Sequence, residues 1–325
     1  SIRQNSPEKR SMKVELVCDR HYLTTADNKP ICEDRASVSV WVSRGEKGER
    51  TCLHTMTFDL LMEPDDLAPL FSGSNWLSTV CFMNLLAGTR IWRSSLVLAE
   101  HLMRSVLQQD VRGRRVIELG CGPGVPGMLL ARCGADVVLS DTEDLQRLIE
   151  RNARRNMTGE DALSIDGEDD GRGSVCVHPL RWSRQAAKEL KDKMANDQLE
   201  WIPRQPAADA GGGFDMILSC DCVYEPLYGD SWRDLSEAID ELAGPLTEVW
   251  IAVERRNNDG VDNFIARLEE GFAVDRVCVE AAEGHASGDT AVAAGADECT
   301  LSSCGESDSA VVLLKAKKRE AGRRG

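Results

Sequence analysis

The sequence predicts an α/β protein with a mostly parallel sheet, preceded by a small antiparallel β extension. Three observations predict this fold class. From Arg115 onward, short apolar runs alternate with helical patterns of about ten to fifteen residues, which is typical of strand–helix–strand units. The last two strand-like runs, 272–280 and 310–318, have no helical pattern between them, so we expect them to pair antiparallel. Residues 12–58 hold β-branched and apolar runs separated by polar turns.

Composition limits the functional classes. The 325 residues suffice for one large domain or two modest ones, with 42% apolar and 29% charged residues as in ordinary globular proteins. The formal net charge of −15 argues against a broad nucleic-acid surface, because phosphate contacts need clustered Lys and Arg. The chain has no run of 18 apolar residues and its opening segment has no apolar stretch, so we expect neither a membrane span nor a signal peptide.

The amino-terminal region, 1–84, is expected to be a β-rich extension with a linker. Its strand-like runs cover 13–18, 36–42 and 52–58. Helical potential lies around 65–71 in the linker. A second region is expected over 85–318, and it opens with a helical pattern of apolar residues over 96–107.

The expected strands and helices of the region 85–318 alternate along the chain. The runs predicted as strands are 115–120, 136–141, 174–180, 214–221 and 247–254. The helical patterns are 125–134, 143–156, 231–244 and 261–271. Parallel strands joined by helical crossovers place their carboxyl ends at one edge of the sheet, which is the usual ligand site of such folds.

Two acidic segments are expected to be solvated insertions. Residues 159–173 carry six acids and one Arg, and residues 281–309 carry six acids and no Lys or Arg. Together they hold −11 of the net charge, which leaves about −4 for the rest of the chain. Residues 203–213 are expected to be a Pro/Gly-rich linker, and 319–325 a basic tail.

Cysteine usage indicates a reducing compartment. The twelve cysteines contain no Cys-x-x-Cys pair and no zinc-like spacing with the five histidines, so no metal site is expected. Several of them, such as Cys133 and Cys220, lie in apolar segments, which favours buried free thiols. We therefore expect a cytoplasmic protein, with the nucleus as a second location.

The strongest motif is the sequence Val-Ile-Glu-Leu-Gly-Cys-Gly-Pro-Gly at 116–124, where a strand turns into a helix. Val125 occupies the third glycine position of the dinucleotide fingerprint, so the spacing is Gly-x-Gly-x-Gly instead. Glu118, at the strand end, would repel a pyrophosphate and suits a cofactor with cationic character. Asp141 ends the next strand 21 residues after Gly120, and its carboxylate suits the two hydroxyls of a ribose.

These residues resemble motif I and the following acidic position of the class I, seven-strand methyltransferases that use S-adenosylmethionine. The resemblance implies a Rossmann-like seven-stranded sheet whose last strand is antiparallel. It also implies that Glu118, Gly120, Cys121 and Gly122 form the cofactor site and that Asp141 binds the ribose. A glycine turn that serves packing alone and a nicotinamide oxidoreductase are the alternatives.

A second set of motifs narrows the family. The sequence Asp-Cys-Val-Tyr at 221–224 follows a predicted strand, Gly-Thr-Arg-Ile-Trp stands at 88–92, and His-Pro-Leu-Arg-Trp stands at 178–182. Together with the glycine motif, this ordered set resembles the protein-lysine methyltransferases grouped as methyltransferase family 16. The resemblance covers about residues 85–280 and the last strand.

The family resemblance implies roles for further residues. Trp92, Trp182 and Cys220 would contact the cofactor, while Asp221 and Tyr224 would face the methyl-accepting side chain. A lysine has an ordinary pKa near 10.4, and a carboxylate favours its charged form, so Asp221 is expected to orient the acceptor rather than act as a strong base. The implied partner is a protein such as a chaperone or a translation elongation factor, with no membrane or nucleic-acid partner, and the chain is expected to be a monomer.

Alternatives within this interpretation concern the acceptor. The chain could methylate another nucleophile, such as a histidine ring or a small molecule, or bind the cofactor as an interaction module without catalysis. Tyr228 is a second aromatic residue that could shape an acceptor channel. Residues 255–258, which follow the strand ending at Glu254, are a candidate loop on the substrate side.

Overall fold

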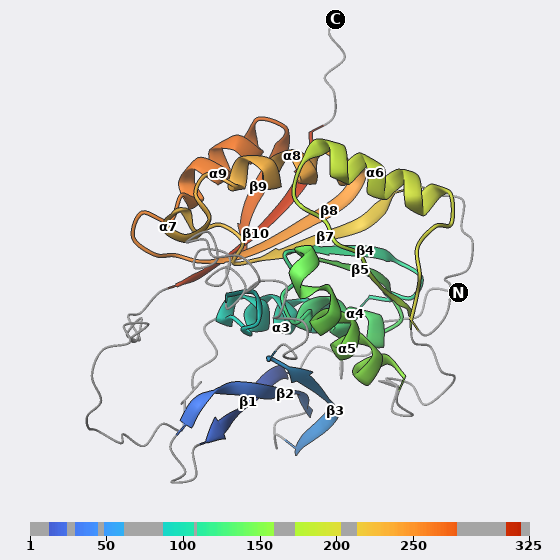
Figure 1. Cartoon of the computed structure of the whole chain (residues 1–325), viewed down its shortest axis with the longest axis vertical. Helices are drawn as coiled ribbons and strands as arrows, with labels where there is room; N and C mark the ends of the chain where they lie inside the picture. The colour runs from blue at the N-terminus through green and yellow to red at the C-terminus, as the bar shows by residue number, and fades with distance from the viewer. Residues whose placement is uncertain are drawn as a thin grey trace, which may run out of the picture.

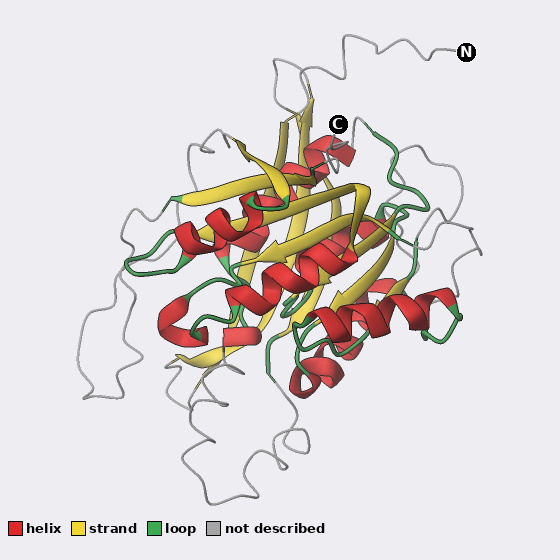
Figure 2. Ribbon diagram, turned by 90° about the horizontal axis from the view of Figure 1, so that it is seen from above, coloured by secondary structure: helices red, strands yellow, loops and turns green. Residues whose placement is uncertain are grey.

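The computed structural model describes residues 13–24, 30–44, 49–61, 87–106, 109–158, 173–202, 213–277 and 310–319. Their elements form four layers (Figure 1). A three-stranded sheet is followed by a layer of helices, a seven-stranded sheet and a second layer of helices. Figure 2 shows the helices on both faces of the large sheet.

The small sheet consists of β1 (Lys13–Thr24), β2 (Pro30–Arg44) and β3 (Glu49–Asp59), paired antiparallel in that order. Alternate residues on the inner face are buried, among them Val14, Leu16, Val38, Val40 and Met56. The three predicted β runs are confirmed, and each strand extends beyond its apolar run.

The large sheet has the strand order β6-β5-β4-β7-β8-β10-β9. Its strands are β4 (Arg115–Leu119), β5 (Asp136–Ser140), β6 (Val175–Val177), β7 (Phe214–Cys220), β8 (Ala243–Glu254), β9 (Phe272–Val277) and β10 (Val311–Lys318). Strands β4 to β8 run parallel, and β10 runs antiparallel to both of its neighbours. The predicted parallel sheet with an antiparallel last strand is therefore confirmed.

Helices cover both faces of this sheet. The face toward the small sheet carries α3 (Arg93–Val106), α4 (Val125–Arg132) and α5 (Gln146–Met157), the last entered through the 3-10 turn η2 (Glu143–Leu145). The opposite face carries α6 (Arg184–Ala195), α8 (Trp232–Leu242) and α9 (Val261–Glu269), and α7 (Glu225–Tyr228) is a single turn near the sheet edge. Buried apolar side chains form one cluster on each face.

The sequence pattern did not identify α6. Only Ala187 and Leu190 of this helix are buried, so it has almost no apolar stripe to detect. A local signal marks its start instead, because the Ser183 hydroxyl accepts a hydrogen bond from the Ala186 N–H at 3.1 Å.

The small sheet is attached to the layer of helices beneath the large sheet through helix α5. Asn152 accepts the N–H of Asp59 at 2.7 Å and donates to its carbonyl at 3.0 Å. Asn156 makes the same pair of bonds with Thr57, at 3.0 and 2.9 Å. The Asp59 carboxylate also pairs with Arg151. Two amide side chains one helical turn apart thus satisfy the edge of β3 that would otherwise be open.

Several predictions fall outside the described residues. These are the helical potential around 65–71, the acidic insertions at 159–172 and 281–309, most of the linker at 203–212 and the tail at 320–325. None of the helices among the described residues is long and apolar enough to cross a membrane.

Candidate active site

The glycine turn between β4 and α4 is built from left-handed backbone. Gly120, Gly122 and Gly124 have φ values of 64°, 51° and 85°, a region that disfavours any residue with a Cβ. Space is equally restrictive at the first two. A Cβ on Gly120 would lie 2.4 Å from the Cys222 Sγ, and one on Gly122 would lie 2.9 Å from the Gly88 carbonyl oxygen. The turn is therefore packed against two of the other motifs predicted for the site, 88–92 and 221–224.

Asp141 follows β5 and faces the glycine turn. Its Oδ2 accepts the N–H of Gly122 at 2.8 Å and its Oδ1 accepts the N–H of Thr142 at 2.7 Å. Burial raises the pKa of Asp141, and these hydrogen bonds partly counteract the rise. A carboxylate fixed in this way keeps lone pairs for two further donors, as a ribose diol requires.

Glu118 lies beneath the glycine turn rather than on its open side. The residue is only 1% exposed, its Oε2 accepts the Gly127 N–H at 2.8 Å, and its Oε1 has no hydrogen-bond partner among the described residues. Burial raises the pKa of Glu118 to about 8. The acid therefore supports the first turn of α4 as a mainly neutral carboxyl at pH 7.

The aromatic and cysteine residues predicted for the cofactor site surround the same turn. The Trp182 ring comes within 3.0 Å of the position of a Cβ on Gly120. Cys121 is buried, and its Sγ contacts the Gly122 carbonyl at 3.5 Å. Cys220 is buried at the end of β7. Burial raises the pKa of both thiols well above the ordinary value, so they are neutral apolar neighbours of the site.

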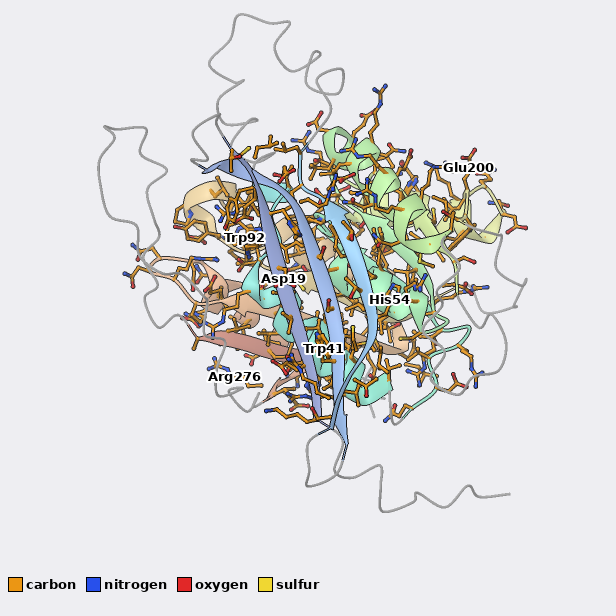
Figure 3. The ribbon with its side chains drawn as sticks, turned by 90° about the horizontal axis from the view of Figure 1, so that it is seen from below. Asp19, Trp41, His54, Trp92, Glu200 and Arg276 are labelled. Carbon is orange, nitrogen blue, oxygen red and sulfur yellow. The ribbon has the colours of Figure 1, made fainter. Side chains whose placement is uncertain are left out.

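Trp92 lies on the segment that contacts the turn through Gly88, and its Nε1 donates to the Ala87 carbonyl at 3.0 Å. The end of β1 reaches the same segment, because Arg20 donates to the Ile91 carbonyl at 3.0 Å. Figure 3 shows Trp92 near that end of the small sheet. The amino-terminal extension thus borders the site region.

Asp221 directly follows β7 and has a left-handed backbone (φ 54°), an unusual conformation for a residue other than glycine. Its carboxylate forms a two-pronged ion pair with Arg256, with distances of 2.7 Å to Nη2 and 3.1 Å to Nη1. Oδ1 also accepts the N–H of Glu254 at 3.1 Å, and the Glu254 carboxylate accepts from Arg256 at 2.6 Å. One guanidinium is therefore shared by two carboxylates at neighbouring strand ends.

Two aromatic rings complete this group. The Arg256 guanidinium carbon lies 5.4 Å from the Trp92 ring centre and 5.2 Å from that of Tyr224, both within cation–π range. We call Asp221, Glu254, Arg256, Trp92 and Tyr224 the arginine cluster. Burial lowers the pKa of Arg256, but its hydrogen bond and charge interaction with Asp221 and the charge of Glu254 leave that pKa raised. The guanidinium is permanently charged.

The structure brings all ten predicted site residues to one edge of the sheet or directly beneath it. Sequence reasoning did not identify Arg256 as a member, although it marked 255–258 as a candidate substrate-side loop. It also missed Cys222, which packs on Gly120 inside the motif that was recognised. Tyr228 belongs to the same region, since burial followed by the charges of Cys222, Asp141 and Asp221 raises its pKa. Among the described residues, no three His, Cys, Asp or Glu side chains are placed to hold a metal ion.

A left-handed glycine turn and a strand-end acid on this strand order are typical of Rossmann-like, S-adenosylmethionine-dependent methyltransferases. The chain belongs to methyltransferase family 16, described as lysine methyltransferase, whose profile matches residues 83–186 and 180–271. S-adenosylmethionine is its cofactor. The residues fit it, because Asp141 is held ready for two hydroxyl donors and the Trp182 ring packs against the glycine turn at Gly120.

Similar proteins have different names and activities. The chain is 37% identical over 150 residues to the secreted RxLR effector protein 48 of Plasmopara viticola, covering 45% of this chain and 66% of that protein. It is 25% identical over 187 residues to the protein N-lysine methyltransferase METTL21A of Danio rerio (58% and 69% covered). It is 26% identical over 179 residues to the histone-arginine methyltransferase METTL23 of Xenopus laevis (54% and 62% covered). The matches thus span about two thirds of each relative.

Solved structures include a similar chain. The magnesium protoporphyrin IX methyltransferase of Synechocystis with bound SAM is 13% identical, with a TM-score of 0.37, over 79% of this chain and 90% of that chain.

Proposed function

We propose that the protein transfers a methyl group from S-adenosylmethionine to a lysine side chain of a protein. The observation that carries this proposal is the arginine cluster. Its carboxylates and aromatic rings hold the cationic side chain of Arg256, and the Asp221 Oδ2, which accepts one hydrogen bond from Arg256, can accept a further nitrogen at the strand end next to the glycine turn. The family, described as lysine methyltransferase, supports the same acceptor, and so does METTL21A, which is a protein N-lysine methyltransferase.

The cofactor supplies a methyl group on a cationic sulfur, which is a good leaving group. The chain's residues then have to bind, align and exclude water. Asp141 and the glycine turn hold the cofactor, with Trp182 beside it. Asp221 and Tyr224 orient the acceptor nitrogen. The amine must lose its proton before its lone pair can form the new bond.

The test is transfer of a tritiated methyl group into host lysate proteins, followed by mass spectrometry of the labelled residues. Calorimetry with S-adenosylhomocysteine is the parallel measurement. We expect S-adenosylhomocysteine to bind and the label to appear on lysine. Label on histidine, or on arginine as for the histone-arginine methyltransferase METTL23, would overturn the lysine assignment while leaving the methyltransferase class intact. Absence of S-adenosylhomocysteine binding would overturn both.

The protein substrate is proposed to present a basic segment around its target lysine. Strand β9 ends at Val277 and β10 begins at Val311, which pairs with Glu254, so residues 278–309 leave and re-enter the fold at the site edge. The acidic stretch 281–309 lies in this interval. The other acidic stretch, 159–173, joins the end of α5 to the amino end of β6, at the opposite edge of the sheet.

The two acidic stretches form a matched pair for a deletion test, since residues 281–309 and residues 160–171 each carry a net charge of −6. Replacing 281–309 with a short neutral linker should raise the Michaelis constant for the labelled substrate and weaken its salt dependence. The same replacement of 160–171 should change neither. Equal effects of both deletions would remove the proposed role of the site-edge stretch.

The proposal extends to the protein substrate and to the location of the protein in the cell. The first candidate substrate is a translation elongation factor, since one mouse relative is EEF1A lysine methyltransferase 3, and the second is a chaperone. We place the protein in the cytoplasm and also in the nucleus, because the described cysteines are free thiols, as in a reducing compartment. Fractionation of the host cell with detection of the protein tests the location.

A further inference from the structure

Arg256 and Glu254, rather than Asp221, are the charged groups that the arginine cluster presents to an incoming side chain. The side chain of Asp221 is only 3% exposed, whereas that of Arg256 is 18% exposed. The guanidinium covers the carboxylate with two hydrogen bonds and lies near the rings of Trp92 and Tyr224. An acceptor nitrogen that approaches Asp221 must therefore come close to a fixed positive charge.

The bonding of Asp221 leaves room for such an approach. Its Oδ1 accepts two hydrogen bonds, from the N–H of Glu254 and from Arg256. Its Oδ2 accepts one, from Arg256, and an ionised carboxylate oxygen has about two acceptor directions. One direction of Oδ2 thus remains for the acceptor, and Arg256 fixes where it points.

A carboxylate alone would be a poor environment for a lysine that has to become neutral. It stabilises the ammonium form, and only the neutral amine has a lone pair for methyl transfer. A nearby guanidinium has the opposite effect, because a like charge disfavours the ammonium. A pair of opposite charges can therefore hold the nitrogen by hydrogen bonding without stabilising its proton.

We infer that Arg256 is a positioning residue that orients Asp221 and keeps the bound acceptor amine neutral and nucleophilic. This inference rests on the proposed lysine methyl transfer. In that step the amine first releases its proton to water. Its lone pair then forms the N–CH₃ bond, while the S–CH₃ bond breaks and its electron pair stays on sulfur as a neutral thioether.

Other charged and titratable groups surround the same position. They come from the ends of β5, β7 and β8, from α7 and from the segment before α3. They are Asp141, Asp221, Cys222, Glu254, Asp259, Tyr224, Tyr228 and Arg90. Arg256 lies between them and donates to both strand-end carboxylates, Asp221 and Glu254, so its removal alters the charge at the acceptor most directly.

The first test measures binding without turnover. Sinefungin carries a primary amine where the cofactor carries its methyl-bearing sulfur, and S-adenosylhomocysteine carries no cation there. We expect Arg256→Gln to increase the ratio of sinefungin affinity to S-adenosylhomocysteine affinity by about tenfold near pH 7, since the ammonium loses a repelling neighbour. Unchanged S-adenosylhomocysteine affinity shows that the variant is folded. A ratio that stays constant or falls overturns the inference.

The matched control is Arg255→Gln. This substitution removes the same charge from the same loop, but Arg255 pairs with Asp259 and Asp262 instead of Asp221. It should leave the affinity ratio unchanged. Arg256→Lys should keep the wild-type ratio, because it retains the charge, while losing the two-pronged geometry. If Arg255→Gln and Arg256→Gln shift the ratio equally, the effect belongs to the whole loop and the inference fails.

The second test is the pH profile of methyl transfer to a degenerate peptide library centred on a single lysine. Arg256→Gln should raise the pKa seen in kcat, which reports the bound acceptor, by about one unit, so that kcat falls about tenfold at neutral pH and recovers in more alkaline buffer. A rate loss that is equal at all pH values means a merely structural ion pair. If wild type binds S-adenosylhomocysteine yet labels no lysine, the proposed function fails, while the sinefungin ratio still decides the role of Arg256.

Discussion

Asp141 and Asp221 end parallel strands at the same edge of one sheet, yet the fold compensates their charges in opposite ways. Asp141 is held by the backbone N–H groups of Gly122 and Thr142. Asp221 is held by a guanidinium, that of Arg256, and by one backbone N–H. The charge of Asp141 is left uncompensated for a ligand, while the charge of Asp221 is compensated by the guanidinium of Arg256.

The difference shows how one sheet edge serves two chemistries. A backbone-held carboxylate is a good acceptor for neutral hydroxyl donors, which bring no charge of their own. A carboxylate paired with a guanidinium can direct a nitrogen without fixing a proton on it. Position at a strand end is therefore shared, and the neighbouring residues decide the role.

The largest expected effect is on Asp221. Asp221→Ala should reduce methyl transfer by about 10³-fold, because the acceptor loses its orienting oxygen and Arg256 loses its main partner. The affinity for S-adenosylhomocysteine should stay within several-fold of wild type, as measured by calorimetry. Normal turnover by this variant would mean that the acid-to-acceptor contact has no role.

The reverse pattern is expected for Asp141. Asp141→Asn should weaken S-adenosylhomocysteine binding by about 100-fold, since the amide places an NH₂ group against a backbone N–H or a ribose hydroxyl. At saturating cofactor, its turnover should recover more than that of Asp221→Ala. If both variants lose affinity and turnover in the same proportion, the two acids act as one site and the contrast between them is lost.

The two regions meet where Gly120 contacts Cys222, and a methyl group inserted there tests that contact. Gly120→Ala should destabilise the fold by about 2–3 kcal/mol, because it adds a crowded contact at 2.4 Å to an unfavourable positive φ. Gly113→Ala is the matched control. Gly113 has a similar φ of 70° but nothing within 4 Å of its Cβ position, so about 1 kcal/mol is expected. Chemical denaturation of both variants separates crowding from backbone strain.

The cofactor side was predictable from sequence because it is local. The glycines, Glu118 and Asp141 lie within two strand–helix units, and the left-handed turn needs glycine wherever it occurs. The pairing of Asp221 with Arg256 was not predictable, because it depends on β7 and β8 being neighbours and on a positive φ at Asp221. A signal existed in the Arg-Arg pair directly after the strand end, but the sequence does not say which arginine turns inward.

The elements of the fold show the same division. Strands with continuous apolar runs, such as β4 and β7, were identified because both of their faces are buried. Helix α6 was missed because only two of its side chains are buried. The docking of β3 on α5 was also invisible, since it relies on two asparagines that read as ordinary polar positions of a helix.

The smallest expected effect concerns Glu118, the third acid of this edge. Its pKa of about 8 in the folded state exceeds the ordinary value of 4.5, so between these values the folded protein binds more protons than the unfolded chain. Stability should therefore fall as pH rises through this window, by about 1 kcal/mol per pH unit. Glu118→Gln cannot ionise and should lack this slope, as measured by urea denaturation between about pH 5 and pH 7.

The Glu118 result also determines the charge of the cofactor side. In the Glu118→Gln variant the amide oxygen can still accept the Gly127 N–H, so the variant keeps the hydrogen bond at the start of α4 while removing the titratable group. If wild type and Glu118→Gln show the same pH dependence, Glu118 is ionised in the folded protein and two carboxylates, not one, bear negative charge beside the glycine turn. Sinefungin binding would then gain no pH dependence from Glu118, and Asp141 would no longer be the single uncompensated acid set against the neutralised Asp221.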